Sequence, residues 1–118
     1  MKMIWAMIRP EFAQKVIVAL EHAGIWAMTR LNVTGSGLDR DNPPVTIPQA
    51  DKSWEMLMIA VPDNEVAKAV MVIRAHARSE EPGPHDGETS GNGKIFITYI
   101  DESLTIRTAG TTNRGPCA

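Results

Sequence analysis

The sequence predicts an α+β domain with the ferredoxin-like order β-α-β-β-α-β. Two observations lead to this prediction. Four apolar stretches are rich in strand-forming residues, and two further stretches between them repeat apolar residues at helical spacing. The 118 residues are enough for one such domain with a modest core. We therefore expect two helices to cover one face of a four-stranded sheet.

The first half of the chain predicts a strand, a helix and a second strand. Residues 1–9 are apolar on both alternating faces, which is typical of a buried strand. Pro10 suits the first position of a helix, and Gly24 can end that helix in the left-handed conformation. Residues 25–34 are rich in strand formers. The apolar residues at helical spacing are Phe12, Val16, Leu20 and Ala23.

The second half predicts a strand, a helix and a last strand, separated by two long loops. Residues 54–61 are apolar on both faces, and residues 94–101 form the fourth strand. Asp63 is placed to cap the second helix. The loops cover residues 35–52 and 79–93, and structureless connections of this length usually have a function. The buried stripe of the second helix is Val66, Ala69 or Val70, Ile73 and Ala77.

The strands are apolar on the face that the helices do not cover. A monomer would expose this surface to water, which is unfavourable for a soluble protein. Self-association is the simplest way to cover it. The sequence therefore favours an oligomer over a monomer.

The turn Gly91-Asn92-Gly93-Lys94 is a candidate anion site. Glycines reach positive φ and bare consecutive backbone N–H groups, and the lysine adds a mobile cation. Arg107, about one strand-length later, can supply a bidentate grip on phosphate. The same turn also serves as an ordinary connection between strands. The pattern therefore predicts a phosphate site, with a plain turn as the alternative.

Five motifs in this order resemble the PII signal-transduction proteins and their PII-like relatives, over residues 1 to about 110. The motifs are residues 1–10, Ala23 to Thr29, Val33 to Gly37, Ala60 to Asp63, and Gly91 to Phe96 with Thr105 to Thr108 behind it. The resemblance implies a homotrimer with a domain at residues 1–110 and a flexible tail at 111–118. It also implies that 35–52 is the T-loop, which docks onto partners, and that 79–93 is the B-loop, which wraps nucleotide phosphates between subunits.

The same resemblance implies a nucleotide site. It places apolar contacts and hydrogen bonds to adenine at Met7, Met28, Thr29, Ala60 and Val61. It places phosphate contacts at Gly35, Gly37, Gly91, Asn92, Gly93, Lys94 and Arg107.

Three positions depart from the family pattern. A phosphate-binding arginine is replaced by Leu38, a glutamine that helps hold magnesium and 2-oxoglutarate by Asp39, and another arginine by Thr105. Fewer cations weaken ATP more than ADP or AMP. The chain thus looks closer to the inorganic-carbon and carboxysome-associated branch, with bicarbonate at Gly37, Leu38 and Arg40 and a bicarbonate transporter as the regulated partner. One alternative is a classical nitrogen-regulatory PII protein that binds ATP and 2-oxoglutarate. Relatives linked to nitrogen fixation or to metal transport are further alternatives.

Composition argues against several other classes. With 12 basic and 14 acidic residues, the net charge of −2 does not favour nucleic-acid binding. No apolar stretch reaches the length of a membrane span. Cys117 is the only cysteine, which fits a reducing cytoplasm. The acidic run at 80–88, which contains His85, is typical of a solvated surface, so we expect no metal site.

Catalysis is the alternative of another class. No Ser/His/Asp arrangement with suitable spacing is present, so we expect no catalytic residues and a regulator rather than an enzyme. A small ferredoxin-fold enzyme with weak nucleotide hydrolysis is the competing interpretation, with Asp39 positioning a water.

Overall fold

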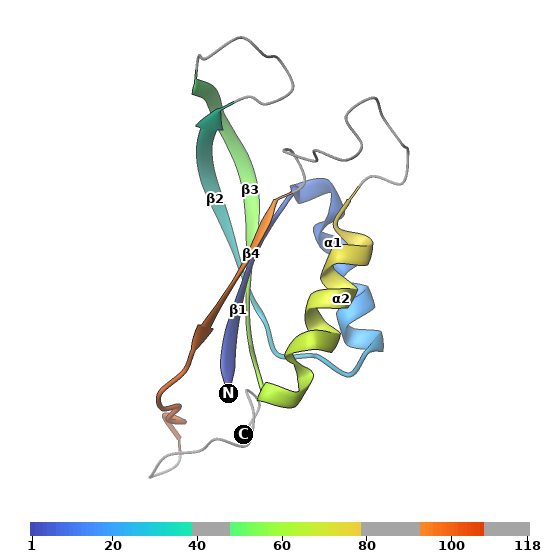
Figure 1. Ribbon diagram of the computed structural model, residues 1–118, viewed down its shortest axis with the longest axis vertical. Helices are drawn as coiled ribbons and strands as arrows, with labels where there is room; N and C mark the ends of the chain where they lie inside the picture. The colour runs from blue at the N-terminus through green and yellow to red at the C-terminus, as the bar shows by residue number, and fades with distance from the viewer. Residues whose placement is uncertain (39–47, 79–92, 108–118) are drawn as a thin grey trace.

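Four strands form one antiparallel sheet, and both helices cover the same face of it (Figure 1). The computed structural model describes residues 1–38, 48–78 and 93–107, with side chains at 1–35, 53–78 and 93–107. The strand order in the sheet is β2-β3-β1-β4. The predicted β-α-β-β-α-β order is confirmed. The elements are β1 (Lys2–Ile8), α1 (Pro10–His22), β2 (Thr29–Leu38), β3 (Pro48–Val61), a short 3-10 helix η1 (Asp63–Glu65), α2 (Val66–His76) and β4 (Lys94–Tyr99).

The hydrophobic core lies between the sheet and the helices. Alternate residues of β1 and β3 face it, because side chains along a strand point to opposite faces in turn. The register pairs Ile4 with Ile59 and Ala6 with Leu57, and all four side chains are fully buried. The helices complete the core with Val16, Leu20, Ala69 and Ile73.

The ends of α1 follow the predicted signals. Pro10 occupies the first turn, where a missing N–H costs nothing. Gly24 follows the helix with φ of +86°, and the neighbouring Ile25 N–H donates to the Leu20 carbonyl at 2.9 Å. The predicted apolar stripe is partly wrong. Val16 and Leu20 are buried, but Ala13 and Ile17 are buried in place of Phe12 and Ala23, which are only partly covered.

The hairpin of β2 and β3 is longer than the sequence predicts. The second strand begins at Thr29 rather than residue 25, and it continues to Leu38. The third strand begins at Pro48 rather than residue 54. Much of the predicted 35–52 loop is therefore strand. Glycine, serine and proline here resemble a loop in composition, but cross-strand hydrogen bonds satisfy the backbone. A register shift between Gly35 and Gly37 accommodates the irregular residues.

Asp63 does not cap α2 as predicted. It opens η1, and no side-chain cap bond is formed at either η1 or α2. Its carboxylate instead pairs with the amino group of Met1 at 2.8 Å. This hydrogen bond and charge lower the pKa of Asp63, with a smaller contribution from Lys2. The residue thus links the start of β1 to the end of β3.

One buried carboxylate lies on the helix side of the sheet. Glu55 is 7% exposed, and its Oε2 accepts a hydrogen bond from Arg30 Nε at 2.7 Å. Nη2 of the same guanidinium lies 2.7 Å from that oxygen. These two contacts hold the neighbouring strands β2 and β3 together near the start of β2.

We expect Arg30→Ala to destabilise the fold by about 1–3 kcal/mol, because Glu55 would stay buried without its partner. Arg30 is about half exposed, so the loss is smaller than for a fully buried pair. Denaturant unfolding at fixed protein concentration measures this change. The double variant Arg30→Ala/Glu55→Leu should recover part of the loss. A single variant as stable as the wild type would contradict the assignment.

Candidate functional site

The start of β4 is held tightly against β1. Gly93 has φ of +108°, a region that residues with a side chain rarely adopt. A Cβ at Gly93 would overlap the carbonyl oxygen of Met7, and it would lie 3.1 Å from the carbonyl carbon. Lys94 follows directly and pairs with Met7 in the sheet register. The glycine therefore permits a close approach that fixes where Lys94 enters the sheet.

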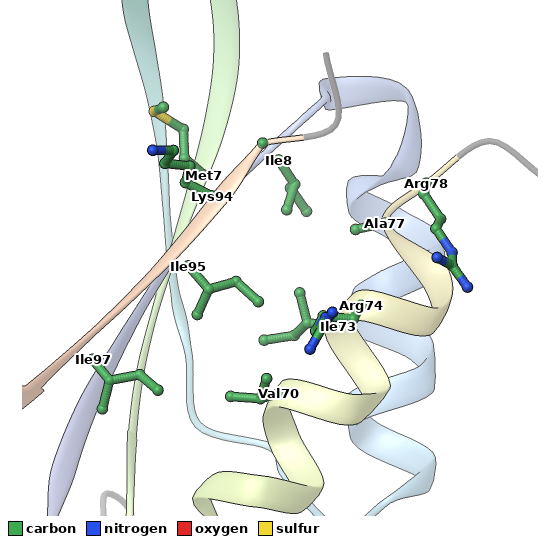
Figure 2. Close-up of a pocket in the computed structure, with 11 residues that line it drawn as sticks. Met7, Ile8, Val70, Ile73, Arg74, Ala77, Arg78, Lys94, Ile95 and Ile97 are labelled. Atoms are coloured by element: carbon green, nitrogen blue, oxygen red, sulfur yellow. The ribbon is translucent and has the colours of Figure 1, made fainter. Parts of the chain in front are cut away.

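The side chain of Lys94 lies on the face of the sheet away from the helices. Figure 2 shows Lys94 and Met7 side by side on that face, while Ile8 and Ile95 point toward α2. Lys94 is exposed, whereas Met7 is partly buried. The structure thus brings together three predicted site residues: a lysine, the glycine that positions it, and an apolar neighbour.

The other predicted glycines lie at the opposite edge of the sheet. Gly35 and Gly37 are in the outer part of β2. A Cβ added at Gly35 would lie 3.0 Å from the indole of Trp54. Trp54 sits diagonally across the hairpin, opposite Val33. This contact was not predicted, although a glycine inside a strand often marks a close approach.

The residues predicted to contact adenine differ in burial and in the face of the sheet on which they lie. Thr29 is exposed at the first residue of β2, and Ala60 is partly buried on the face without helices. Met28 is partly buried and packs against the core. Val61 is 1% exposed and belongs to the core itself. Its side chain faces the helix side of the sheet, which leaves the backbone of Val61 for the predicted adenine contact.

Arg107 lies far from Lys94 within one chain. Lys94 begins β4, which spans about 17 Å at the rise of a strand. The chain continues beyond the far end of β4 (Figure 1). Arg107 lies in this later segment and is exposed. A single subunit therefore does not bring these two cations to one phosphate group.

The other predicted site residues are not among the residues that the structure describes. Gly91, Asn92, Asp39 and Arg40 are outside the described residues, and so is the side chain of Leu38. The same holds for most of the predicted B-loop, for the acidic run with His85, and for Cys117. The proposed bicarbonate position therefore stays a prediction.

Within residues 1–38, 48–78 and 93–107, no group of three or more His, Cys, Asp or Glu side chains is arranged to hold a metal ion. Neither of the two described helices is long and apolar enough to cross a membrane.

Comparison with known proteins gives a consistent result. The family described as Nitrogen regulatory protein P-II matches residues 1–110. A nitrogen fixation nifHD region GlnB-like protein 1 of Methanothermococcus thermolithotrophicus is 36% identical, covering 94% of this chain and 98% of the relative. A nitrogen regulatory protein P-II of Nostoc punctiforme is 34% identical, covering 92% and 93%.

A solved structure is similar in fold. The crystal structure of Arabidopsis thaliana PII bound to citrate superposes with a TM-score of 0.72 at 24% identity, covering 97% of this chain and 87% of that one. At 24% sequence identity, this similarity shows a shared fold and nothing more specific.

Proposed function

This chain belongs to the P-II family of nitrogen regulatory proteins, and from this premise we propose that it is a regulator that binds adenine nucleotide between the subunits of a homotrimer. The observation that carries the proposal is the start of β4 at Lys94, behind the positive φ of Gly93. It places a lysine and exposed backbone at a fixed point beside Met7, with the parts that an anion site needs.

The trimer is supported by the face of the sheet that the helices leave open. Rows of large apolar side chains cross this face, including Trp5 beside Met58 and Phe96. Phe96 is 52% exposed and Leu31 is 43% exposed in one chain. Covering these side chains with further subunits removes apolar area from water, at about 25 cal/mol per Å². Three sheets packed about one axis are the arrangement that the family implies.

A site shared by two subunits follows from the positions of the cations. Lys94 and Arg107 lie at opposite ends of β4, so both reach one nucleotide only if they come from different chains. We assign the phosphates to the Gly93–Lys94 turn of one subunit and to Arg107 of its neighbour. Met7, Thr29 and Ala60 are the described residues that we assign to the adenine.

We propose a preference for ADP or AMP over ATP, because two cations of the family pattern are replaced by Leu38 and Thr105. The nucleotide preference does not identify the process that the protein regulates. Relatives such as that of Methanothermococcus thermolithotrophicus come from nifHD regions, which favours a partner linked to nitrogen fixation. They give no support to the inorganic-carbon branch, so bicarbonate, a bicarbonate transporter and a carboxysome link stay predictions from the loop sequence. A cytoplasmic location also stays a prediction.

Calorimetric titration tests the function. We expect ADP and AMP to bind the full-length protein more tightly than ATP, with intact nucleotide recovered afterwards because the site is regulatory. Each nucleotide is titrated alone, with 2-oxoglutarate and with bicarbonate. Strengthening by bicarbonate would favour the carbon-linked branch, whereas Mg-ATP with 2-oxoglutarate would favour the classical one. Lack of binding by all three nucleotides would contradict the proposal, and rapid hydrolysis would favour the enzyme alternative.

A further inference from the structure

A cavity of about 410 Å³ between α2 and β4 belongs to the candidate nucleotide site. Met7, Gly93 and Lys94 border it near the start of β4. Arg74, in the last turn of α2, and Arg78, just after the helix, border it from the opposite side. The end of α2 and the start of β4 lie at the same end of the sheet (Figure 1). The cavity therefore brings two arginines of the same chain to the residues already assigned to phosphate.

Gly93 separates the two faces of the sheet at this point. Figure 2 shows Lys94 on the face without helices and the guanidinium of Arg74 beside Ile73, on the helix side. Gly93 is exposed and has no side chain, so a phosphate chain can pass over it and meet Lys94 on one face and Arg74 on the other. The guanidinium of Arg78 is turned outward, which places its charge at the rim of the cavity.

Arg74 and Arg78 are exposed cations with unused hydrogen-bond donors. Within the described part of the chain, neither arginine forms a hydrogen bond or an ion pair. Two like charges four residues apart at the end of a helix are unfavourable by themselves. Asp63 borders a wider hollow together with both arginines, but its carboxylate already pairs with the Met1 amino group at 2.8 Å. The arginines therefore offer positive charge to an anion from outside the chain.

The helix dipole is the competing explanation for these cations. Positive side chains near a helix C-terminus complement the dipole whether or not a ligand is present. The arginines differ, however, from Lys68, an exposed cation of the same helix that borders neither hollow and pairs with Glu65. Their shared border with Gly93 relates them to the anion site, and a dipole role does not require that position.

The number of cations indicates which phosphate the arginines contact. Lys94 of one subunit and Arg107 of its neighbour are the cations that we assign to the nucleotide, and the family cations at Leu38 and Thr105 are missing. A guanidinium binds phosphate oxygens through two parallel hydrogen bonds. A second phosphate group adds negative charge that the first two cations do not match. Two further arginines on the helix side of Gly93 supply this charge.

We infer that Arg74, with Arg78 at the rim, binds the second phosphate of the nucleotide, so that the protein prefers ADP to AMP. The inference rests on the proposed function, because it needs a nucleotide at Gly93 and Lys94. It places on α2 a part of the positive charge that the family pattern has at the positions of Leu38 and Thr105.

The test is a calorimetric titration of the full-length protein with AMP and with ADP. We expect the wild type to bind ADP at least about tenfold more tightly than AMP, because the second phosphate gains charge-assisted hydrogen bonds. In Arg74→Gln/Arg78→Gln, the affinity for ADP should fall about tenfold, to that for AMP, while the affinity for AMP stays unchanged. A purely structural role would weaken both nucleotides alike, so the ratio of the two affinities separates the two roles.

Lys68→Gln is the matched control. It removes a cation of the same helix outside the cavity and should leave both affinities unchanged. Equal affinity of the wild type for AMP and ADP, a double arginine variant with the wild-type ratio, or an equal loss of both nucleotides would overturn the inference and leave the nucleotide site in place. Absence of binding of either nucleotide to the wild type would instead contradict the proposed function, and the inference with it.

Discussion

Replacing Lys94 by alanine is expected to weaken adenine-nucleotide binding by at least about tenfold and to leave the oligomer intact. A charge-assisted hydrogen bond to phosphate is worth about 1.5–3 kcal/mol, and the side chain of Lys94 is exposed, outside the hydrophobic core. Arg107→Ala should have a similar effect, because this exposed arginine provides the second cation.

Two controls separate binding from folding. Lys68→Ala removes an exposed lysine of α2 whose only role among the described contacts is a 3.5 Å pair with Glu65, so its nucleotide affinity should equal that of the wild type. Sedimentation should give the same assembly for all three variants. Normal nucleotide binding by both Lys94→Ala and Arg107→Ala would show that the site is misplaced.

Gly93→Ala is expected to be the most damaging alanine substitution among the described glycines, with a loss of about 3 kcal/mol or more in the free energy of unfolding. The new Cβ would meet the Met7 carbonyl at a backbone φ of +108°. The start of β4 must then move, so the Met7–Lys94 register and nucleotide binding should both suffer.

Gly24→Ala is the matched control for this prediction. Gly24 also has a positive φ, of +86°, but nothing lies within 4 Å of an added Cβ. Its cost should be limited to the left-handed backbone, about 1–2 kcal/mol. Denaturant unfolding of both variants compares the two costs. Equal stability of the two variants would mean that the close approach to Met7 is not what Gly93 provides.

Much of the fold could be predicted because its signals are local. Runs that are apolar on both faces located β1 and the inner part of β3, and Pro10 and Gly24 marked the ends of α1. The outer hairpin could not be predicted in this way. Gly35 and Pro48 suggest a loop by composition, and only pairing across the hairpin makes them strand residues. Asp63 was misassigned because its partner, the Met1 amino group, is remote in sequence.

At the candidate site, only the features that depend on residue type could be predicted. The glycine pattern indicated positive φ at Gly93, and the structure has it, together with a close approach to Met7. The side-chain direction of Val61 depends on the register of β3 with β1, which composition does not reveal. The cavity that Met7, Gly93 and Lys94 line together with α2 was not predicted, since it depends on how α2 packs against β4.

The central claim is that each nucleotide site takes Lys94 from one subunit and Arg107 from the next. Co-expression of Lys94→Ala and Arg107→Ala subunits, followed by nucleotide titration of the mixed oligomers, tests it most directly. Random assembly should restore about one site in four to wild-type affinity, because a mixed interface can combine the intact lysine with the intact arginine. Mixed oligomers that bind as poorly as either variant alone would contradict the shared site.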